Sequence, residues 1–209
     1  MANGYGNSWR SGLKQAVAPA LEPVTPAEAK SHANITSSAD DTLIGYYITA
    51  ARRAVEQYTG RALIHQDWDY VQDDATDPVS LPLPPLVSAT PYYTDLSDVE
   101  HAEDSTIYIV DTSVEPGRLF TKSSNIWSTT RGLSGFRVRF RAGYGATAAD
   151  VPEDLKTAIK EIVTFLYEHR GDDSVQKAFT DETADSLVRL VPVAAMFCAP
   201  YRTAGRLLA

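Results

Sequence analysis

Residues 41–70 read DTLIGYYITAARRAVEQYTGRALIHQDWDY, and within them the spacing of apolar residues changes from that of a helix to that of a strand. Up to Gly60 the apolar residues recur every three or four positions, which places them on one helix face. Gly60 suits the left-handed residue that ends a helix. From Leu63 the alternation has a period of two, typical of a strand. The predicted stripe is Ile44, Tyr47, Ile48, Ala51, Val55 and Tyr58, and Arg52, Arg53, Glu56 and Gln57 are expected to be exposed.

Further helices are predicted on both sides of this stretch. Thr25-Pro26-Ala27-Glu28 is a capping box that starts a short helix ending near residue 33. Pro152, with acids beside it in the first turn, opens the strongest helix. Its buried stripe is expected to be Leu155, Ala158, Ile159, Ile162, Val163 and Leu166. A short helix over residues 193–199 follows. Three to four helices would then form a bundle.

The region between the helices, residues 63–145, is predicted to be an inserted antiparallel β meander, so the fold class is α+β. Its clearest strand is FRVRFR (136–141), with Phe136, Val138 and Phe140 on one face. The prolines of residues 78–87 predict an edge or a connector, because proline cannot donate to a central ladder. Residues 1–22 are expected to be a flexible arm, with helices within 26–60 and 151–200 and a tail at 203–209.

Composition excludes several functions. A formal net charge of −8 over 209 residues argues against a general nucleic-acid binder and against an anionic membrane surface. Cys198 is the single cysteine, which excludes an intrachain disulfide and a cysteine-cluster zinc site, and its apolar surroundings predict a buried thiol. No phosphate-binding loop or nucleophile elbow is present, and we expect no catalytic residue, cofactor or metal site.

Charge is sorted along the chain. Residues 62–117 hold twelve acids and no Lys or Arg, whereas residues 118–145 hold six basic residues and no acid. Arg137, Arg139 and Arg141 alternate with apolar residues and so share one strand face. Three interpretations stay open for them. They could form a solvated face paired with acids of the same sheet, contact phosphates, or contact the acidic surface of an identical subunit, which could close into a ring.

Several segments resemble the tailed-phage head–tail connector (adaptor) family. They span residues 23–202 in order, and the most specific is YTGRAL (58–63). The others are VTPAEAK (24–30), AARRAVEQYTGRALI (50–64) with Gln66 and Trp68, LPLPPL (81–86), Tyr108 with Val110-Asp111, EPGR (115–118), VRFRAGYG (138–145), VPEDLK (151–156), YEHRG (167–171) and APYR (199–202). Residues 1–22 and 172–185 depart from the family.

The resemblance implies a structural protein and not an enzyme. Family members form a ring, typically twelvefold, beneath the portal protein. The ring extends the DNA channel without binding DNA specifically, and it docks a stopper or tail-completion protein. Gene transfer agents, which are domesticated phage particles, use the same component. The location would be the head–tail junction (neck) of the virion, after synthesis in the bacterial host cytoplasm, with no membrane partner.

Three sets of residues become candidates under this resemblance. Arg137, Arg139 and Arg141 are the candidate intersubunit interface, and Pro200, Tyr201 and Arg202 are the candidate portal contact. The candidate channel-facing acids are Asp95, Asp98, Glu100, Glu103 and Asp104. Two rivals remain: another neck or tail-completion module that is monomeric until it docks, and a small hydrolase that uses Asp67, Asp69, Asp73 and Asp74.

Overall fold

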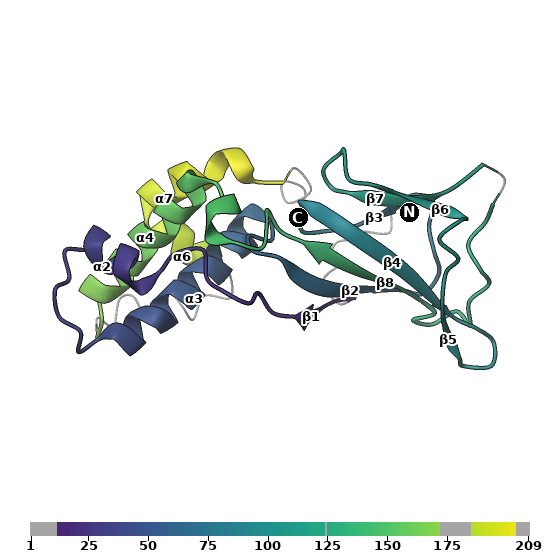
Figure 1. Ribbon diagram of the computed structural model, residues 1–209, viewed down its shortest axis with the longest axis horizontal. Helices are drawn as coiled ribbons and strands as arrows, with labels where there is room; N and C mark the ends of the chain where they lie inside the picture. The colour runs from purple at the N-terminus through teal and green to yellow at the C-terminus, as the bar shows by residue number, and fades with distance from the viewer. Residues whose placement is uncertain (1–11, 124, 172–184, 204–209) are drawn as a thin grey trace, which may run out of the picture. The chain divides into compact units, whose positions relative to one another are not determined.

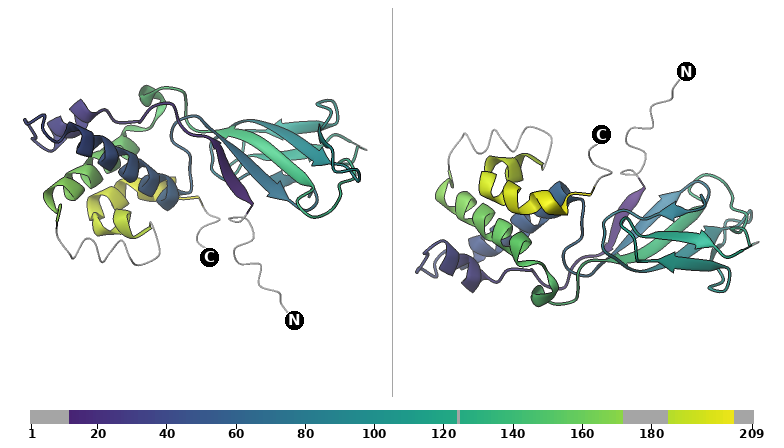
Figure 2. Two further views of the ribbon diagram at one scale, coloured as in Figure 1. Left: turned by 90° about the horizontal axis from the view of Figure 1, so that it is seen from below. Right: turned by 90° about the horizontal axis from the view of Figure 1, so that it is seen from above.

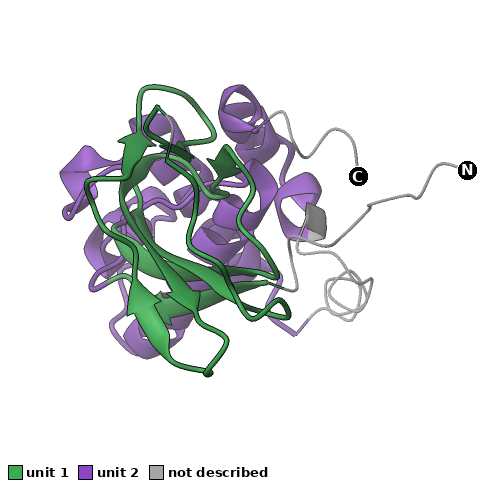
Figure 3. Ribbon diagram, turned by 90° about the vertical axis from the view of Figure 1, so that its right-hand side faces the viewer, with its two compact units in different colours: residues 1–19, 65–143, 204–209 green, residues 20–64, 144–203 purple. Residues whose placement is uncertain are grey.

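The computed structural model describes residues 12–123, 125–171 and 185–203. The chain divides into two compact units, coloured separately in Figure 3. Unit 1 comprises residues 1–19, 65–143 and 204–209 and holds the strands, and unit 2 comprises residues 20–64 and 144–203 and holds the helices. The predicted α+β class, a helical bundle with antiparallel strands inserted in it, is confirmed.

Unit 2 is a bundle of helices around one apolar core, labelled in Figure 1. Its described elements are α2 (Pro26–His32), α3 (Asp41–Thr59), the short 3-10 turn η1 (Ala148–Asp150), α4 (Glu153–Glu168), α6 (Asp185–Leu190), α7 (Pro192–Cys198) and the 3-10 turn η2 (Ala199–Tyr201). Helix α3 packs against α2, α4, α6 and α7, and α4 also packs against α7. None of the helices in the described ranges is both long and apolar enough to span a membrane.

The sequence signals for the helix ends are confirmed. The Thr25 hydroxyl accepts a hydrogen bond from the Glu28 amide at 3.2 Å, and the Glu28 carboxylate accepts one from the Thr25 amide at 2.7 Å. These bonds satisfy backbone donors that a helix start leaves free. At the other end of α3, Gly60 has a φ of 71° and its amide bonds the Glu56 carbonyl.

The apolar stripes pack as predicted, with one residue of α3 less covered than expected. All six predicted stripe residues of α4 are buried, and so are those of α3 except Tyr47, which is half-buried. The Cys198 thiol is buried in the same core, and burial raises its pKa to about 12. Cys198 is therefore an inert packing residue, because the thiolate is the reactive form of cysteine.

The prediction that Arg52 and Glu56 are exposed is wrong. Arg52 is only 4% exposed, and its guanidinium donates to the Glu22 carboxylate at 2.7 Å and to the Glu56 carboxylate at 2.6 Å. Glu56 also accepts the Leu63 amide at 3.0 Å, and Glu22 accepts the Thr49 hydroxyl. Burial opposes the charge of Arg52, but the two carboxylates outweigh it and raise its pKa. This buried network fixes the chain on both sides of α3.

Unit 1 contains two antiparallel sheets. The five-stranded sheet has the order β1-β2-β8-β4-β5, and the three-stranded sheet has the order β3-β7-β6. The strands are β1 (Leu13–Val17), β2 (Gln66–Gln72), β3 (Val79–Ser80), β4 (Leu86–Thr94), β5 (Glu100–Ala102), β6 (Tyr108–Asp111), β7 (Arg118–Thr121) and β8 (Phe136–Ala142). The order is not that of a simple meander, because β8 lies between β2 and β4.

Strand β8 carries the core of unit 1. Its residues Phe136, Val138 and Phe140 are buried, as the alternation predicts. Leu119 of β7 and Val79 of β3 lie opposite each other in the second sheet, and both are fully buried. The two sheets form separate layers in Figure 2. The ring of Trp127 lies edge-on to Phe136 at 5.3 Å, and its indole donates to the Thr76 carbonyl.

The predicted flexible arm over residues 1–22 needs correction in its second half. Residues Leu13–Val17 form β1, which pairs with β2 at the edge of the five-stranded sheet. Most β1 side chains are exposed, so the strand leaves no clear period-two pattern in the sequence. Its place comes from backbone pairing with β2. Residues 1–11 lie outside the described ranges.

A substitution of Arg52 tests the buried network. We expect Arg52→Met to lower the free energy of unfolding by about 3 kcal/mol, because the half-buried Glu22 carboxylate and the buried Glu56 carboxylate both lose the Arg52 guanidinium. Urea unfolding followed by far-UV circular dichroism, which reports mainly the helices, measures the change.

Arg53→Met is the matched control, since Arg53 is the next residue of α3 and is exposed. We expect it to change the free energy of unfolding by less than about 0.5 kcal/mol. Equal effects of the two substitutions would contradict the role assigned to Arg52.

Candidate interaction surfaces

The outer face of the five-stranded sheet brings the acidic and the basic stretches of the chain together. Strand β8 pairs with β2 so that Arg139 lies opposite Asp69 and Arg141 opposite Asp67. On its other side β8 pairs with β4, which places Tyr92 opposite Arg137. Because side chains alternate across a strand, all of these residues share the face opposite the core.

Each arginine of β8 is paired within the chain. Arg139 binds both carboxylate oxygens of Asp69, at 2.9 and 2.8 Å, and Arg141 binds both oxygens of Asp67, at 2.7 and 3.1 Å. Arg137 bridges Asp69 and Glu100 at 2.8 to 2.9 Å, and its guanidinium lies over the Tyr92 ring. Of the three interpretations left open, pairing with acids of the same sheet is therefore present.

The pairing shifts the proton affinities of these groups in opposite directions. Hydrogen bonds from Arg139 and Arg137 lower the pKa of Asp69, and those from Arg141 lower the pKa of Asp67. The same bonds raise the pKa values of Arg139 and Arg141, and bonds to Glu100 and then Asp69 raise the pKa of Arg137. The two aspartates therefore stay ionised at neutral pH. A general acid needs a raised pKa, so the geometry weighs against the hydrolase interpretation.

The other members of the predicted acid cluster stabilise loops. Asp73 accepts the Ser134 amide at 2.8 Å, and Asp74 accepts the Thr130 hydroxyl at 2.7 Å. Within the part of the chain that the structure describes, no three His, Cys, Asp or Glu side chains are grouped to hold a metal ion.

The five candidate channel-facing acids differ in their exposure and in the groups that they bind. Glu103 is only 6% exposed and accepts both the amide and the hydroxyl of Ser128 at 2.9 Å, so its assignment to a channel wall is wrong. Glu100 is bound to Arg137. Asp98 and Asp104 are exposed and Asp95 is half-buried, and Asp95 and Asp104 accept backbone amides in their own turns. A run of acids in sequence cannot distinguish these roles.

The candidate portal contact is partly engaged within unit 2. The Tyr201 hydroxyl lies 3.2 Å from Asp154, and its carbonyl accepts Arg61 at 2.6 Å. Arg202 lies over the Tyr58 ring at 4.9 Å. Pro200 is exposed. These contacts attach the last described residues to the end of α3 and the start of α4, a role that the sequence did not indicate.

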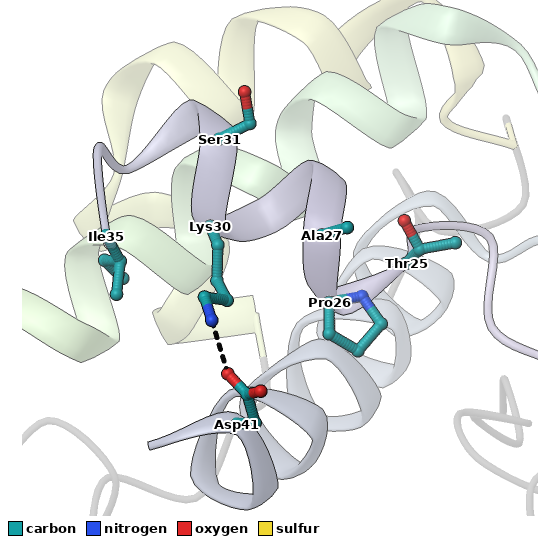
Figure 4. A pocket seen from close by; sticks show the side chains of 7 residues that line it. All are labelled: Thr25, Pro26, Ala27, Lys30, Ser31, Ile35 and Asp41. Carbon is teal, nitrogen blue, oxygen red and sulfur yellow. Dashed lines mark hydrogen bonds and ion pairs between the residues drawn. The ribbon is translucent and has the colours of Figure 1, made fainter. Parts of the chain in front are cut away.

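A shallow hollow lies between α2 and the start of α3 (Figure 4). It is lined by Thr25, Pro26, Ala27, Lys30, Ser31, Ile35 and Asp41. The Lys30 ammonium points to the Asp41 carboxylate at 2.6 Å, so the two charges in the hollow neutralise each other. The hollow offers no convergent set of groups for catalysis.

The fold is that of neck proteins of gene transfer agent (GTA) particles. A chain from "Neck of empty GTA particle computed with C6 symmetry" has a TM-score of 0.70 and 20% identity, covering 91% of this chain and 95% of that one. A chain from "Neck of native GTA particle computed with C12 symmetry" has a TM-score of 0.70 and 21% identity, covering 91% and 94%. One from "Virion of native gene transfer agent (GTA) particle" has a TM-score of 0.67 and 22% identity, covering 86% and 94%.

Part of the sequence is similar to a protein family. Residues 25–87 match the model of the phage gp6-like head-tail connector proteins, which confirms the resemblance seen in the sequence. The matched segment contains α2, α3, β2 and β3 and, of the Arg52 network, Arg52 and Glu56 but not Glu22. No curated protein sequence matches the chain.

The Asp69 pairs give a prediction for pH dependence. We expect Asp69→Asn to destabilise unit 1 by about 1 to 2 kcal/mol at pH 7, because Arg137 and Arg139 lose a charged acceptor. Since the folded pKa of Asp69 is lowered, its contribution is present above the ordinary value of 3.8 and is lost as the pH falls through the lowered folded pKa. The difference in the free energy of unfolding between wild type and Asp69→Asn should therefore fall towards zero as the pH falls below 3.8.

Urea unfolding followed by tryptophan fluorescence measures this effect, because Trp68 and Trp127 lie in unit 1. Asp98→Asn is the control: its pair with Arg131 is exposed, and exposed pairs contribute up to about 1 kcal/mol and usually less. A stability gap for Asp69→Asn that stays constant from neutral to acid pH would contradict the assignment.

Proposed function

We propose that this chain is a structural head–tail connector of a tailed phage or gene transfer agent, and that it assembles as a ring in the neck of the particle. The observation that carries the proposal is the agreement of two independent comparisons. The fold resembles neck proteins over about nine tenths of both chains, and the sequence of residues 25–87 matches a connector family.

The residues support a role in assembly. The carboxylates of the outer sheet face are held by arginines, and those of the nearby loops by backbone and hydroxyl donors. In the proposed ring the chain lies beneath the portal, extends the DNA channel and docks the tail or a stopper protein. The net charge of −8 suits a channel through which DNA slides without being bound.

Imaging of whole particles tests the proposal. Cryo-electron microscopy of particles from the producing host should place several copies of this chain, related by rotational symmetry, between the portal and the tail. Deletion of its gene should give filled heads without tails. A single copy per particle, or a position away from the neck, would refute the ring and favour a different neck module.

We further propose that the outer sheet face contacts the neighbouring subunit in the ring. Arg139 and Arg141 are bound to aspartates, yet each side chain remains 50% exposed, so both can still reach a second acceptor. Arg137 is enclosed by Asp69, Glu100 and Tyr92 and holds the sheet together. The portal contact through Pro200, Tyr201 and Arg202, and a channel-facing position for Asp104, stay predictions.

A charge swap separates the intersubunit role from the stability of the sheet. Asp67→Arg combined with Arg141→Asp keeps the cross-strand pair but exchanges its charges at the surface. We expect the folded monomer to keep its stability within about 1 kcal/mol. We expect the number of copies retained per particle to fall about tenfold, because like charges then meet across the interface.

The matched control exchanges another cross-strand pair. Asp111→Arg with Arg118→Asp reverses the pair between β6 and β7 in the other sheet. Mass spectrometry of purified particles counts the retained copies for both variants. If particles retain the Asp67/Arg141 variant normally, or lose both variants equally, the outer sheet face does not contact the neighbouring subunit.

A further inference from the structure

Two turns lie together at one end of the five-stranded sheet. Residues 95–99 join β4 to β5, and residues 131–135 lead into β8. Their backbones are directly bonded: the Arg131 amide donates to the Thr94 carbonyl at 2.9 Å, and the Thr94 amide donates to the Gly135 carbonyl at 2.7 Å. The Arg131 guanidinium also binds Asp98 at 2.8 Å and the Leu133 carbonyl at 3.2 Å. One arginine therefore links both turns.

Each turn presents a leucine to solvent. Leu96 is 79% exposed and Leu133 is 78% exposed, and Val99 beside them is 49% exposed. Exposed large aliphatic side chains add nothing to the core of unit 1. When several gather at one place they are typical of a surface that binds another protein.

The turns are rigid, which favours binding. Asp95 accepts the amides of Ser97 and Val99 at 2.8 and 3.0 Å, and its other oxygen bonds His101. The second turn is held by bonds from the Gly132 amide to Thr130 and from the Ser134 amide to Asp73. A side chain displayed on a fixed backbone loses less conformational entropy on binding. The two leucines are therefore preorganised.

Acidic residues surround the leucines. Asp73, Asp74, Asp95 and Asp98 lie in or against the two turns, and Arg131 is already bound to Asp98. The complementary surface would have an apolar recess and a rim of Lys or Arg side chains. The proposed intersubunit contact already uses the exposed parts of Arg139 and Arg141, and Arg137 is held by Asp69 and Glu100, so the outer sheet face of a second copy does not provide this rim.

We propose that residues 95–99 and 131–135 form a docking tip for a different protein, into which Leu96 and Leu133 insert while the surrounding aspartates meet basic side chains. The inference rests on the proposed function and assigns the partner to another component of the neck. Asp95 and Asp98 then face a protein and not the DNA channel.

Single cysteines at the tip test the inference in whole particles. The native Cys198 is buried with a pKa of about 12, so it contributes little background reaction with a maleimide. Leu96→Cys and Leu133→Cys should react rapidly in the free full-length protein. In assembled particles we expect the reaction to be about tenfold slower, because docked central residues are sealed from water. A photoactivated crosslinker on either cysteine should join a different neck protein.

Val114→Cys is the control, in the turn between β6 and β7. It should react at similar rates in the free protein and in particles. The docking tip would be overturned if Leu96→Cys and Leu133→Cys reacted as fast in particles as in the free protein, or if their reaction slowed only as much as that of the control. Crosslinks formed only between copies of this chain would also overturn it. A ring seen at the neck in the same particles would leave the proposed function standing, whereas absence of this chain from the neck would overturn both.

The double variant Leu96→Asp with Leu133→Asp gives a second measurement. Both side chains are exposed, so we expect the fold to be kept. Particles should retain this chain but carry about tenfold less of the crosslinked partner. Normal content of that partner would overturn the inference.

Discussion

The pairing of β8 with β2 is the interaction on which unit 1 depends. It joins the acidic stretch of the chain to the basic stretch, and each strand contributes one sign of charge to the outer face. The same strand turns Phe136, Val138 and Phe140 inward, so a shift of register by one residue would bury arginines and expose the core. Charge on one face and apolar packing on the other therefore specify the same register.

This pairing also explains the separation of charge along the sequence. An acidic segment and a basic segment need not meet a partner's surface when they can meet each other in one sheet. Arg137 is the most fully paired of the three arginines: its guanidinium binds two carboxylates and lies over the Tyr92 ring. In the proposed assembly, the contacts with other chains use what this pairing leaves exposed: half of the Arg139 and Arg141 side chains and the loops at the end of the sheet.

Most of the helical unit could be predicted from the sequence, whereas the order of the strands could not. Periodicity located α3, α4 and the inward face of β8 because each is a local property of its own segment. The position of β8 between β2 and β4 depends on pairing between distant segments, about which alternation says nothing. Strand β1 was missed for a related reason, since its exposed side chains show no period. Arg52 and Glu56 were misassigned because burial of a charged residue requires a partner of opposite charge. One partner of Arg52 is Glu22, which lies thirty positions away in the sequence.

The candidate sites show the same difference between what a local sequence pattern predicts and what only the fold shows. Residue type and alternation were enough to place three arginines on one face, but only the fold shows which carboxylate each one binds. The exposed leucines of the two turns carry no signal in sequence, because a lone leucine in a polar loop is indistinguishable from one that packs inward. Their exposure becomes informative only beside the hydrogen bonds of Asp95 and Arg131, which hold the turns in place. In a protein whose proposed role is to join two others, rigid apolar side chains at the end of the sheet allow subunit contact and partner contact to be made by separate residues. Substitutions can then weaken one contact while leaving the other intact.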